Sequence, residues 1–526
     1  MTIYNSSTLL HSTMGIPLYF HKITNTHKHI ISPKKQRCDR LFLDFNGIIH
    51  NVYQTIKHEI DINMSKIDFQ SNLNQEVVKY MEYILDYAKP KELVYICIDG
   101  VAPLPKIQQQ RKRRYLSAWL QSQQKEEGYV WDSNAISPGT EYMSSLNTHL
   151  RNYIKNSNTK FEIILSDSSQ KGEGEHKIFD YIHCHPNNDF VDVIYGLDAD
   201  LIMLSISCNK SKKFLLREPQ HIHQYNSTIP FLWFDVEKFK TSLIEYHDDM
   251  IDVHSYVFLC FLIGNDFLPN VTYLTIHNDG IHKIVNTYIR LLKNNGKSTI
   301  IKEIGDVYEI DTQVLKDLIE ELSKNEDDEM KSLHKSYYDK SMIFKTNKMR
   351  LENYGISHKD TTTKEIFKQK NWRLHYYYNL FNTNQYNDNI TNDVTKCYIR
   401  GLKWVCDYYF NKSYTNNWYY KYNYSPTLLD IYNFLEVNRN VLTDSVIEKT
   451  INITTDIQLL LILPKLSIDI LPENLRHIMT SRELGVYYPK NFSIHTYLKT
   501  KLHECFPILP IIDITLLEFH LLKMTI

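Results

Sequence analysis

The 526-residue chain has little glycine, almost no net charge and no cysteine spacing of a metal site. With 15 glycines and 16 prolines it is neither collagen-like nor of low complexity, and a net charge of −1 leaves no global field to attract a polyanion. Eight cysteines without a CxxC pair favour buried thiols over zinc or disulfides. No apolar run reaches the length of a membrane span and no import signal is evident, so we expect a cytoplasmic protein without a membrane partner.

What the chain does contain is a set of seven carboxylates in five short apolar or glycine-rich segments. Most of these segments read as a buried strand or helix that ends at a turn, and the carboxyl ends of parallel strands share one edge of a sheet. A cluster of carboxylates repels itself, and a hard divalent cation relieves that repulsion. Singly, each acid is more typical of a cap or turn. Together they predict a Mg²⁺ or Mn²⁺ site made of Asp44, Asp99, Glu173, Glu175, Asp198, Asp200 and Asp266.

From residue 14 to about residue 290, apolar runs alternate with helical patterns of three- and four-residue spacing. The spacing in 77–89 predicts a helix, and the run in 256–269 predicts a buried helix that enters a turn. This alternation predicts an α/β fold with a mostly parallel central sheet flanked by helices. The runs that predict strands are 41–45, 93–99, 161–167 and 191–200.

We expect four divisions along the chain. Residues 1–13 form an N-terminal extension, and residues 14–290 form the α/β region that carries the carboxylates. Residues 291–394 form a connector of irregular helices, in which the acidic run 325–331 is typical of a solvated helix face or loop. Dense aromatics in residues 395–526 predict a second, mainly helical region that packs on the first.

A basic helix is predicted directly after Asp99, with five cations in residues 106–114. Lysine supplies a point charge and arginine a bidentate fork, and together they suit a terminal phosphate. The alternative is a solvated basic face, and Lys112, which points away from the others, is expected to be solvent-exposed. The residues that share one helical face are Lys106, Gln110, Arg113 and Arg114.

These motifs occur in an order that resembles the Xrn/Rat family of 5′→3′ exoribonucleases, over its nuclease core from Met14 to near the C-terminus. In the first half the matching segments are MGIPLYFHKI (14–23), LDFNGIIHN (43–51), IDGVAPLPKIQQQRKRR (98–114), DSNAISPGTEYM (132–143), GEGEHKI (172–178), GLDADLI (196–202) and GNDFLP (264–269). In the second half they are GLKWVCDYY (401–409), WYYKYNYSP (418–426) and PILPIID (507–513).

The resemblance implies a PIN/FEN-like nuclease core and a processive hydrolase that removes mononucleotides from single-stranded RNA with a 5′-monophosphate, as in RNA degradation and mRNA decay. By this similarity the seven carboxylates hold two Mg²⁺ or Mn²⁺ ions, and the basic face of 106–114 grips the 5′-phosphate. His50 stacks on the first base, and Trp418 is its expected partner. Without the resemblance, His50 and Trp418 are both typical of core residues.

The chain departs from the family pattern in three places. Thirteen residues precede Met14, and Asn416 replaces the first tryptophan of an aromatic motif. His254 and Ser255 replace an acidic pair, which puts one accessory acid and the affinity for a second metal ion in question. These departures leave an inactive relative that binds RNA 5′ ends as an alternative. The carboxylates alone also fit a flap-type, structure-specific DNA nuclease.

Overall fold

The computed structural model describes most of the chain, and the expected N-terminal extension, residues 1–13, lies outside the described residues. Among the described residues, no helix is both long and apolar enough to cross a lipid bilayer. The described ranges are 18–59, 64–123, 131–219, 229–295, 299–343, 361–368, 370–381, 383, 388–416, 418–442, 451–499 and 504–524.

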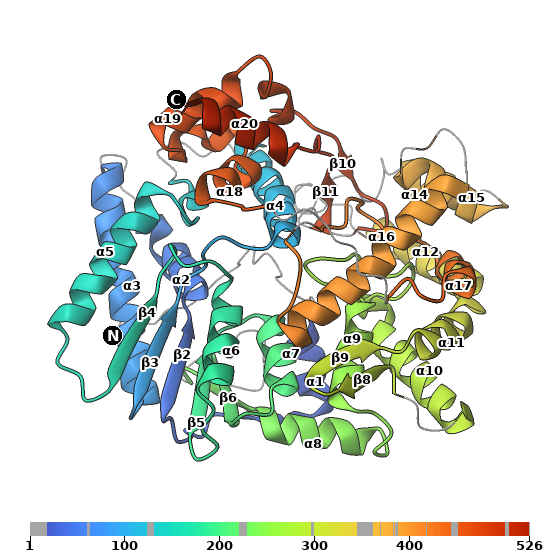
Figure 1. The fold of residues 1–526 in the computed structure, drawn as a ribbon, viewed down its shortest axis with the longest axis horizontal. Coiled ribbons are helices and arrows are strands. Elements are labelled where there is room, and N and C mark those ends of the chain that lie inside the picture. Colours follow the sequence, from blue (N-terminus) through green and yellow to red (C-terminus); the bar gives the residue numbers. More distant parts are fainter. Residues whose placement is uncertain are drawn as a thin grey trace.

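A seven-stranded sheet in the order β1-β7-β6-β5-β2-β3-β4 organises the first half of the chain (Figure 1). The strands β2 to β6 run parallel, whereas β7 pairs antiparallel with β6 and with β1. The expected mostly parallel sheet is therefore confirmed, with its four predicted strands. The strands are β1 (Ile31–Ser32), β2 (Arg40–Asp44), β3 (Leu93–Cys97), β4 (Glu162–Ser166), β5 (Val191–Tyr195), β6 (Lys212–Arg217) and β7 (Leu232–Asp235).

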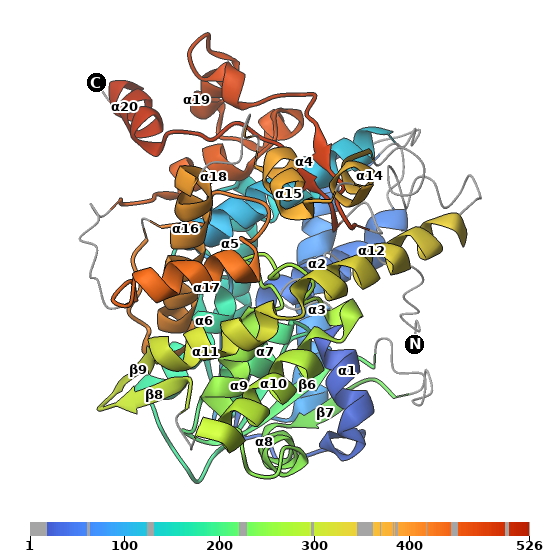
Figure 2. The ribbon, with the colours of Figure 1, turned by 90° about the vertical axis from the view of Figure 1, so that its right-hand side faces the viewer.

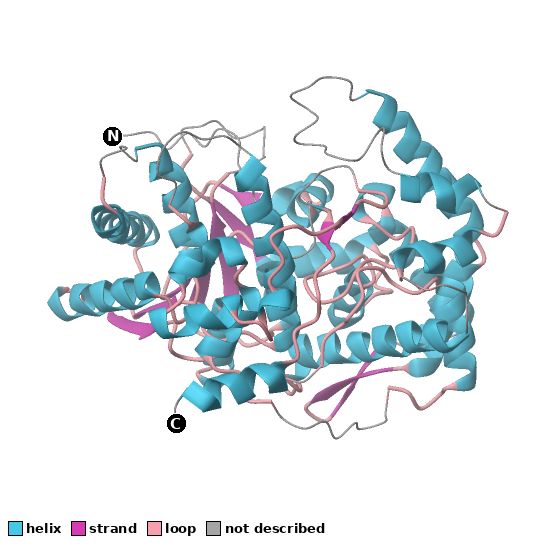
Figure 3. Ribbon diagram, turned by 90° about the horizontal axis from the view of Figure 1, so that it is seen from above, coloured by secondary structure: helices cyan, strands magenta, loops and turns pink. Residues whose placement is uncertain are grey.

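Both faces of this sheet are buried because side chains alternate along each strand. On β2, Leu41 and Leu43 join one core cluster and Phe42 joins another. The first cluster is closed by α2 (Phe45–Ile56), α3 (Lys66–Ala88) and α5 (Glu141–Asn156). The second is closed by α1 (Tyr19–Thr26), α6 (Gly174–Cys184), α7 (Ala199–Ser207), α8 (Val236–Tyr246) and α9 (Val253–Phe261). Seen from above, the sheet occupies one side of the molecule and the other side is mostly helical (Figure 3).

The expected connector contains regular elements rather than irregular helices. An antiparallel hairpin of β8 (Ile301–Ile304) and β9 (Val307–Ile310) turns at Gly305, which has φ 64°. The hairpin's short, mostly exposed strands lack the apolar runs that mark the buried strands of the large sheet. The division boundaries stay a prediction. α10 (Gly280–Asn295) leads into this stretch, and its helices are α11 (Thr312–Ser323), α12 (Glu326–Ile343), α14 (Thr361–Lys368) and α15 (Trp372–Leu380).

The last part of the chain packs on the first through α4 (Leu104–Gln123). Leu104 and Ile107 of α4 share a core with the C-terminal helices, and Arg111 donates to the carbonyl oxygens of Leu461 and Tyr487, both at 2.7 Å. Figure 2 shows α18, α19 and α20 gathered at the opposite end of the molecule from α8 and β7. The elements are α16 (Asp388–Cys406), a π-helical turn (Asp407–Asn411), α17 (Leu428–Val437), α18 (Thr455–Ile462), α19 (Glu473–Arg476), β10 (Ile494–His495), β11 (Phe506–Pro507) and α20 (Ile514–Met524).

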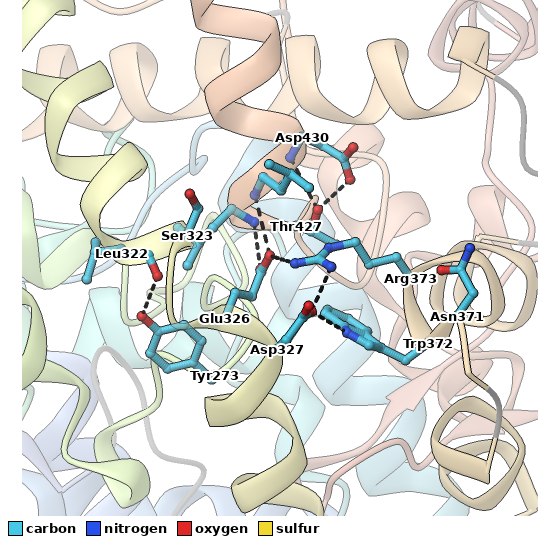
Figure 4. Close-up of polar contacts among 12 residues, drawn as sticks. Tyr273, Leu322, Ser323, Glu326, Asp327, Asn371, Trp372, Arg373, Thr427 and Asp430 are labelled. Atoms are coloured by element: carbon cyan, nitrogen blue, oxygen red, sulfur yellow. Dashed lines mark hydrogen bonds and ion pairs between the residues drawn. The ribbon is translucent and has the colours of Figure 1, made fainter.

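The acidic run 325–331 is not wholly solvated, because Glu326 is fully buried at the start of α12 (Figure 4). Its carboxylate accepts from Arg373 at 2.8 Å and from the backbone N–H of Leu428 at 2.7 Å, where α17 begins. Burial raises the pKa of Glu326, and Arg373 opposes this shift. The expectation of a solvated run is therefore wrong for this residue, which joins α12, α15 and α17.

We predict that Glu326→Ala lowers the free energy of unfolding by about 2–4 kcal/mol, because it leaves a buried helix start and an arginine without their acceptor. The midpoint of urea unfolding, followed by circular dichroism, measures this change. The matched control is Glu321→Ala, which removes an exposed partner of Lys324 and should leave the midpoint unchanged. Equal midpoints for the two variants would show that the buried contact contributes nothing.

Candidate active site

The seven predicted carboxylates gather where the parallel strands end. Asp44 ends β2, and Asp99 follows β3 by two residues. Glu173 and Glu175 flank the first residue of α6, and Asp198 and Asp200 flank the first residue of α7. Asp266 comes from the turn after α9. Acids before and within the first turn of a helix are favoured by the exposed N–H groups there, which explains why each of these two pairs spans a helix start.

Gly174 allows two of these acids to come close together. Its backbone N–H donates to Asp99 Oδ1 at 2.7 Å, and a Cβ on residue 174 would lie 3.1 Å from Asp44 Oδ1 and 3.3 Å from Asp99 Oδ1. Asn46 holds two more atoms of Asp99. Its side-chain N–H donates to Asp99 Oδ2 at 2.9 Å, and its side-chain oxygen accepts from the Asp99 backbone N–H at 3.1 Å. Asp99 is therefore held on three sides before any ligand binds.

The electrostatics of the cluster show that the acids interact. Burial raises the pKa of Asp44 most, followed by the charges of Asp198 and Asp99. Burial and then Asp266 raise the pKa of Asp200 to about 8, and burial raises that of Asp198 to about 6, against Lys106. Burial and the neighbouring charges of Asp200 and Glu173 also raise the pKa of Glu175. The pKa of Asp99 is raised by burial and by the charge of Glu173.

Lys106 is the cation at the centre of the cluster. Its buried ammonium nitrogen lies 2.5 Å from Glu173 Oε2 and 2.8 Å from Asp266 Oδ2. Asp266 and Glu173 raise the pKa of Lys106 against its burial, so it stays charged. In the described part of the chain, no three acid, histidine or cysteine side chains form a preformed metal cage, and several acid oxygens instead face N–H and O–H donors. Buried, mutually repelling oxygen donors nevertheless suit a hard divalent cation.

The second half of the chain contributes two tyrosines that sequence analysis missed. Tyr408 donates to Glu173 Oε1 at 2.5 Å, stacks on Trp404 and contacts the tilted ring of His176, with ring centroids 4.9 and 3.8 Å away. Tyr409 is buried beside the acids, whose charges raise its pKa after burial does. Both lie on the π-helical turn, a distortion that often marks functional sites. No local signal separates these residues from other aromatics of the region.

A cavity of about 1570 Å³ connects the carboxylates with the basic helix. The predicted binding residues Gln110, Arg113 and His50 line it, and so does Arg114. Arg114 also has a structural role, since its guanidinium donates to Asn134 Oδ1 at 3.0 Å and to two backbone carbonyls. The cavity is further lined by Asp44, Asp99, Lys106, Glu173, Glu175, Asp198 and Asp266, whereas Asp200 lies behind this surface, 3% exposed.

Two expectations about single residues are not met. Trp418 does not line the cavity and is buried in the aromatic core. Its ring centroid lies 5.7 Å from that of Trp404, and its indole occupies the space that a side chain at Gly401 would need. Lys112 is not a solvent-exposed outlier. It is half-buried, lines the cavity and donates to Asn423 Oδ1 at 2.7 Å.

The departures at positions 254 and 255 lie away from the carboxylates. Both residues are in the first turn of α9, whereas Asp266 follows its other end, and nine helical residues span about 13 Å. His254 stacks on Tyr308 at 4.2 Å between ring centroids, and Ser255 is buried beside the β8–β9 hairpin. Asn416 is exposed. These side chains therefore do not reach the acid cluster.

Comparison with protein families gives two matches that cover nearly the whole chain. The model described as XRN 5′-3′ exonuclease N-terminus matches residues 14–219, and the Xrn1 helical domain matches residues 246–371 and 345–525. The chain belongs to the XRN 5′-3′ exonuclease family. The similarity between its motifs and the Xrn/Rat family is thus confirmed, and the XRN nuclease core implies use of a divalent metal ion.

Curated XRN relatives are longer than this chain. It is 26% identical to 5′-3′ exoribonuclease 1 of Homo sapiens, over 95% of this chain and 33% of that protein. It is 24% identical to 5′-3′ exoribonuclease 2 of Debaryomyces hansenii, over 95% of this chain and 69% of that protein. Among solved structures, the catalytic core of Rad2 in complex with a DNA substrate matches with a TM-score of 0.32 and 11% identity, over 79% of this chain and 93% of that one.

We predict that Asp200→Asn raises the melting temperature of the protein in EDTA at pH 9. The folded-state pKa of Asp200 is raised to about 8, so the native state loses stability as pH rises from about 4 to 8 and the carboxylate ionises. Removing this charge should restore stability on the order of a few kcal/mol at pH 9 and roughly a quarter of that at pH 5, where the carboxyl is still protonated in the native state.

Differential scanning fluorimetry at the two pH values measures the effect. Asp189→Asn, at an exposed loop position, is the matched control. A melting temperature that is unchanged or lower at pH 9 would contradict the assignment of Asp200 to a self-repelling cluster.

Proposed function

We propose that this XRN protein is a metal-dependent 5′→3′ exoribonuclease that degrades single-stranded RNA with a 5′-monophosphate and releases mononucleotides processively. The observation that supports this most is a single cavity lined by six of the seven carboxylates and, along α4, by the basic residues Lys106, Arg113 and Arg114. The family match gives the direction of the reaction, and the relatives named exoribonuclease give the class of substrate.

The carboxylates Asp44, Asp99, Glu173, Glu175, Asp198, Asp200 and Asp266 would hold the metal, which we propose is a pair of Mg²⁺ or Mn²⁺ ions. Such ions, when bound, lower the pKa of a water and stabilise the leaving oxygen of an in-line displacement at phosphorus. The chain's own residues hold the acids in place: Asn46 and the Gly174 N–H orient Asp99, and Tyr408 orients Glu173. Because water is the nucleophile in this chemistry, the reaction needs no serine or cysteine nucleophile.

The basic face of α4 would select the 5′ end. Gln110 and Arg113 follow Lys106 along α4, and both line the cavity. The helix rises about 1.5 Å per residue, so their side chains extend the basic face away from Lys106. A guanidinium fork binds the oxygens of a terminal phosphate better than those of an internal diester, since the terminal group carries more charge. His50 on α2, exposed at the cavity wall, would stack on the first unpaired base. A cytoplasmic location stays a prediction.

An inactive relative that sequesters 5′ ends is a weaker candidate. The residues that favour it, His254 and Ser255, lie at the far end of α9 from Asp266. A DNA flap nuclease is also weaker, because the family models that match are those of XRN proteins.

We predict that Asp198→Ala lowers the rate of hydrolysis of 5′-monophosphate RNA at least about 100-fold while RNA binding in EDTA persists, because a metal ligand is removed but the basic helix is kept. Release of mononucleotides from a labelled RNA measures the rate, and fluorescence anisotropy measures binding. Asp189→Ala is the control. Full activity of Asp198→Ala would overturn the site, and no release by the unaltered protein with either ion would favour the inactive relative.

We also predict that Arg113→Ala lowers the preference for 5′-monophosphate over 5′-hydroxyl RNA about 10- to 100-fold, the value of one charge-assisted bidentate contact. Competition between the two RNAs in one reaction measures the preference directly. Arg482→Ala, which removes an exposed arginine, should leave it unchanged. An unchanged preference in Arg113→Ala would remove the basic face from 5′-end selection.

A further inference from the structure

The cavity has a second cationic wall, separate from the face of Lys106, Gln110, Arg113 and Arg114. Lys112 follows α4 on a different face, and its Nζ lies 5.9 Å from the centre of the Phe506 ring. Lys499, far away in the sequence, places its Nζ 4.8 Å from the same ring. Both lysines, Phe506 and Asn423 line the cavity, and β11, which carries Phe506, packs against α4.

Among the described residues of this wall, no carboxylate balances the charge of Lys112. Its ammonium group donates to the amide oxygen of Asn423, and burial alone lowers its pKa to about 8. Burial also lowers the pKa of Lys499, and the charges of Glu504 and Cys505 oppose that shift. His495 behind Asn423 is neutral at pH 7, since burial and Lys112 lower its pKa to about 4. An ammonium group that is partly removed from water and has no counter-ion is unfavourable, and an anionic ligand would offset that cost.

The surroundings favour a phosphate of a nucleic acid over other anions. Tyr424 lies edge-on to Phe506 at 5.9 Å between ring centroids, so two cations and two aromatic rings are grouped on this wall, as in sites for single strands. Lys112 lies one turn beyond Gln109, whose amide contacts Asp266 at 3.4 Å. One turn is about 5 Å, so an anion at Lys112 lies within about two stacked nucleotides of the carboxylates.

We propose that Lys112, Lys499, Asn423 and Phe506 form a second phosphate subsite in the cavity, which binds a phosphate group of the RNA and stacks an adjacent base on Phe506. The two lysines supply the charge, and the amide oxygen of Asn423 orients Lys112. The subsite rests on the proposed function, because it assumes that RNA occupies the cavity. It joins α4 of the first half to β11 of the second, so both halves are needed to form it.

Equilibrium binding of fluorescent decamer RNAs in EDTA tests the subsite with the whole 526-residue chain. The arms are 5′-hydroxyl, 5′-monophosphate and 5′-triphosphate RNA, and the variants are Lys112→Gln, Lys499→Gln and both together. We expect each single variant to weaken binding about fivefold to tenfold. In the double variant the slope of log K against log salt should become less negative by about 0.7 for each phosphate that the protein no longer neutralises. Lys112→Arg, which keeps the charge, should retain most of the affinity.

The matched control is Lys523→Gln, since Lys523 also lies over a phenylalanine ring, Phe519 at 4.2 Å, but on an exposed helix. An equal decrease of affinity in all three arms supports the subsite and identifies an internal phosphodiester as its ligand. If the affinity decreases only for the 5′-triphosphate RNA, the subsite is supported and its ligand is a terminal phosphate. Unchanged affinity and slope in the double variant overturn it. Because no metal is present, this result is independent of whether the unaltered protein hydrolyses RNA.

Discussion

The mutual repulsion of seven carboxylates in a buried cluster is the constraint on which the rest of this structure depends. Burial and neighbouring charges raise the pKa values of Asp44, Asp99, Glu175, Asp198 and Asp200, so the fold holds these groups against their own preference. Lys106 offsets part of that repulsion from within, between Glu173 and Asp266. The same crowding of oxygen donors that is costly to the folded state is the kind of environment that a hard divalent cation prefers.

The two halves of the chain are joined through that cluster. α4 extends from the acids toward the C-terminal helices, where Arg111 binds two of their carbonyl groups. In return, the π-helical turn of the second half places Tyr408 on Glu173. The buried contact of Glu326 with Arg373 and the start of α17 joins α12, α15 and α17 (Figure 4), and α17 packs against α16, the helix that leads into this turn. An XRN nuclease core without its helical domain would therefore lack one wall of the cavity and one hydrogen bond to its acids.

Much of the fold and of the acid set could be predicted because each depends on short patterns. The runs that contain Leu41–Leu43 and Leu93–Cys97 are buried on both faces, which gives continuous apolar stretches, and the acids follow such stretches directly. Other features had no such local pattern. The exposed strands of the β8–β9 hairpin carry little apolar signal, and the burial of Glu326 is set by Arg373, 47 positions later. Trp418 and Lys112 were misplaced for the same reason, since their partners are remote in the sequence.

The sequence by itself determined the parallel sheet, the identity of the carboxylates and the basic face of α4, because the periods of strand and helix decide which neighbouring residues share a face. Only the tertiary structure decided that Lys106 lies among the acids, that Tyr408 donates to Glu173 and that Lys112 and Lys499 meet at Phe506. These contacts join residues from tens to hundreds of positions apart. Their distances depend on how whole elements pack, which no local period encodes.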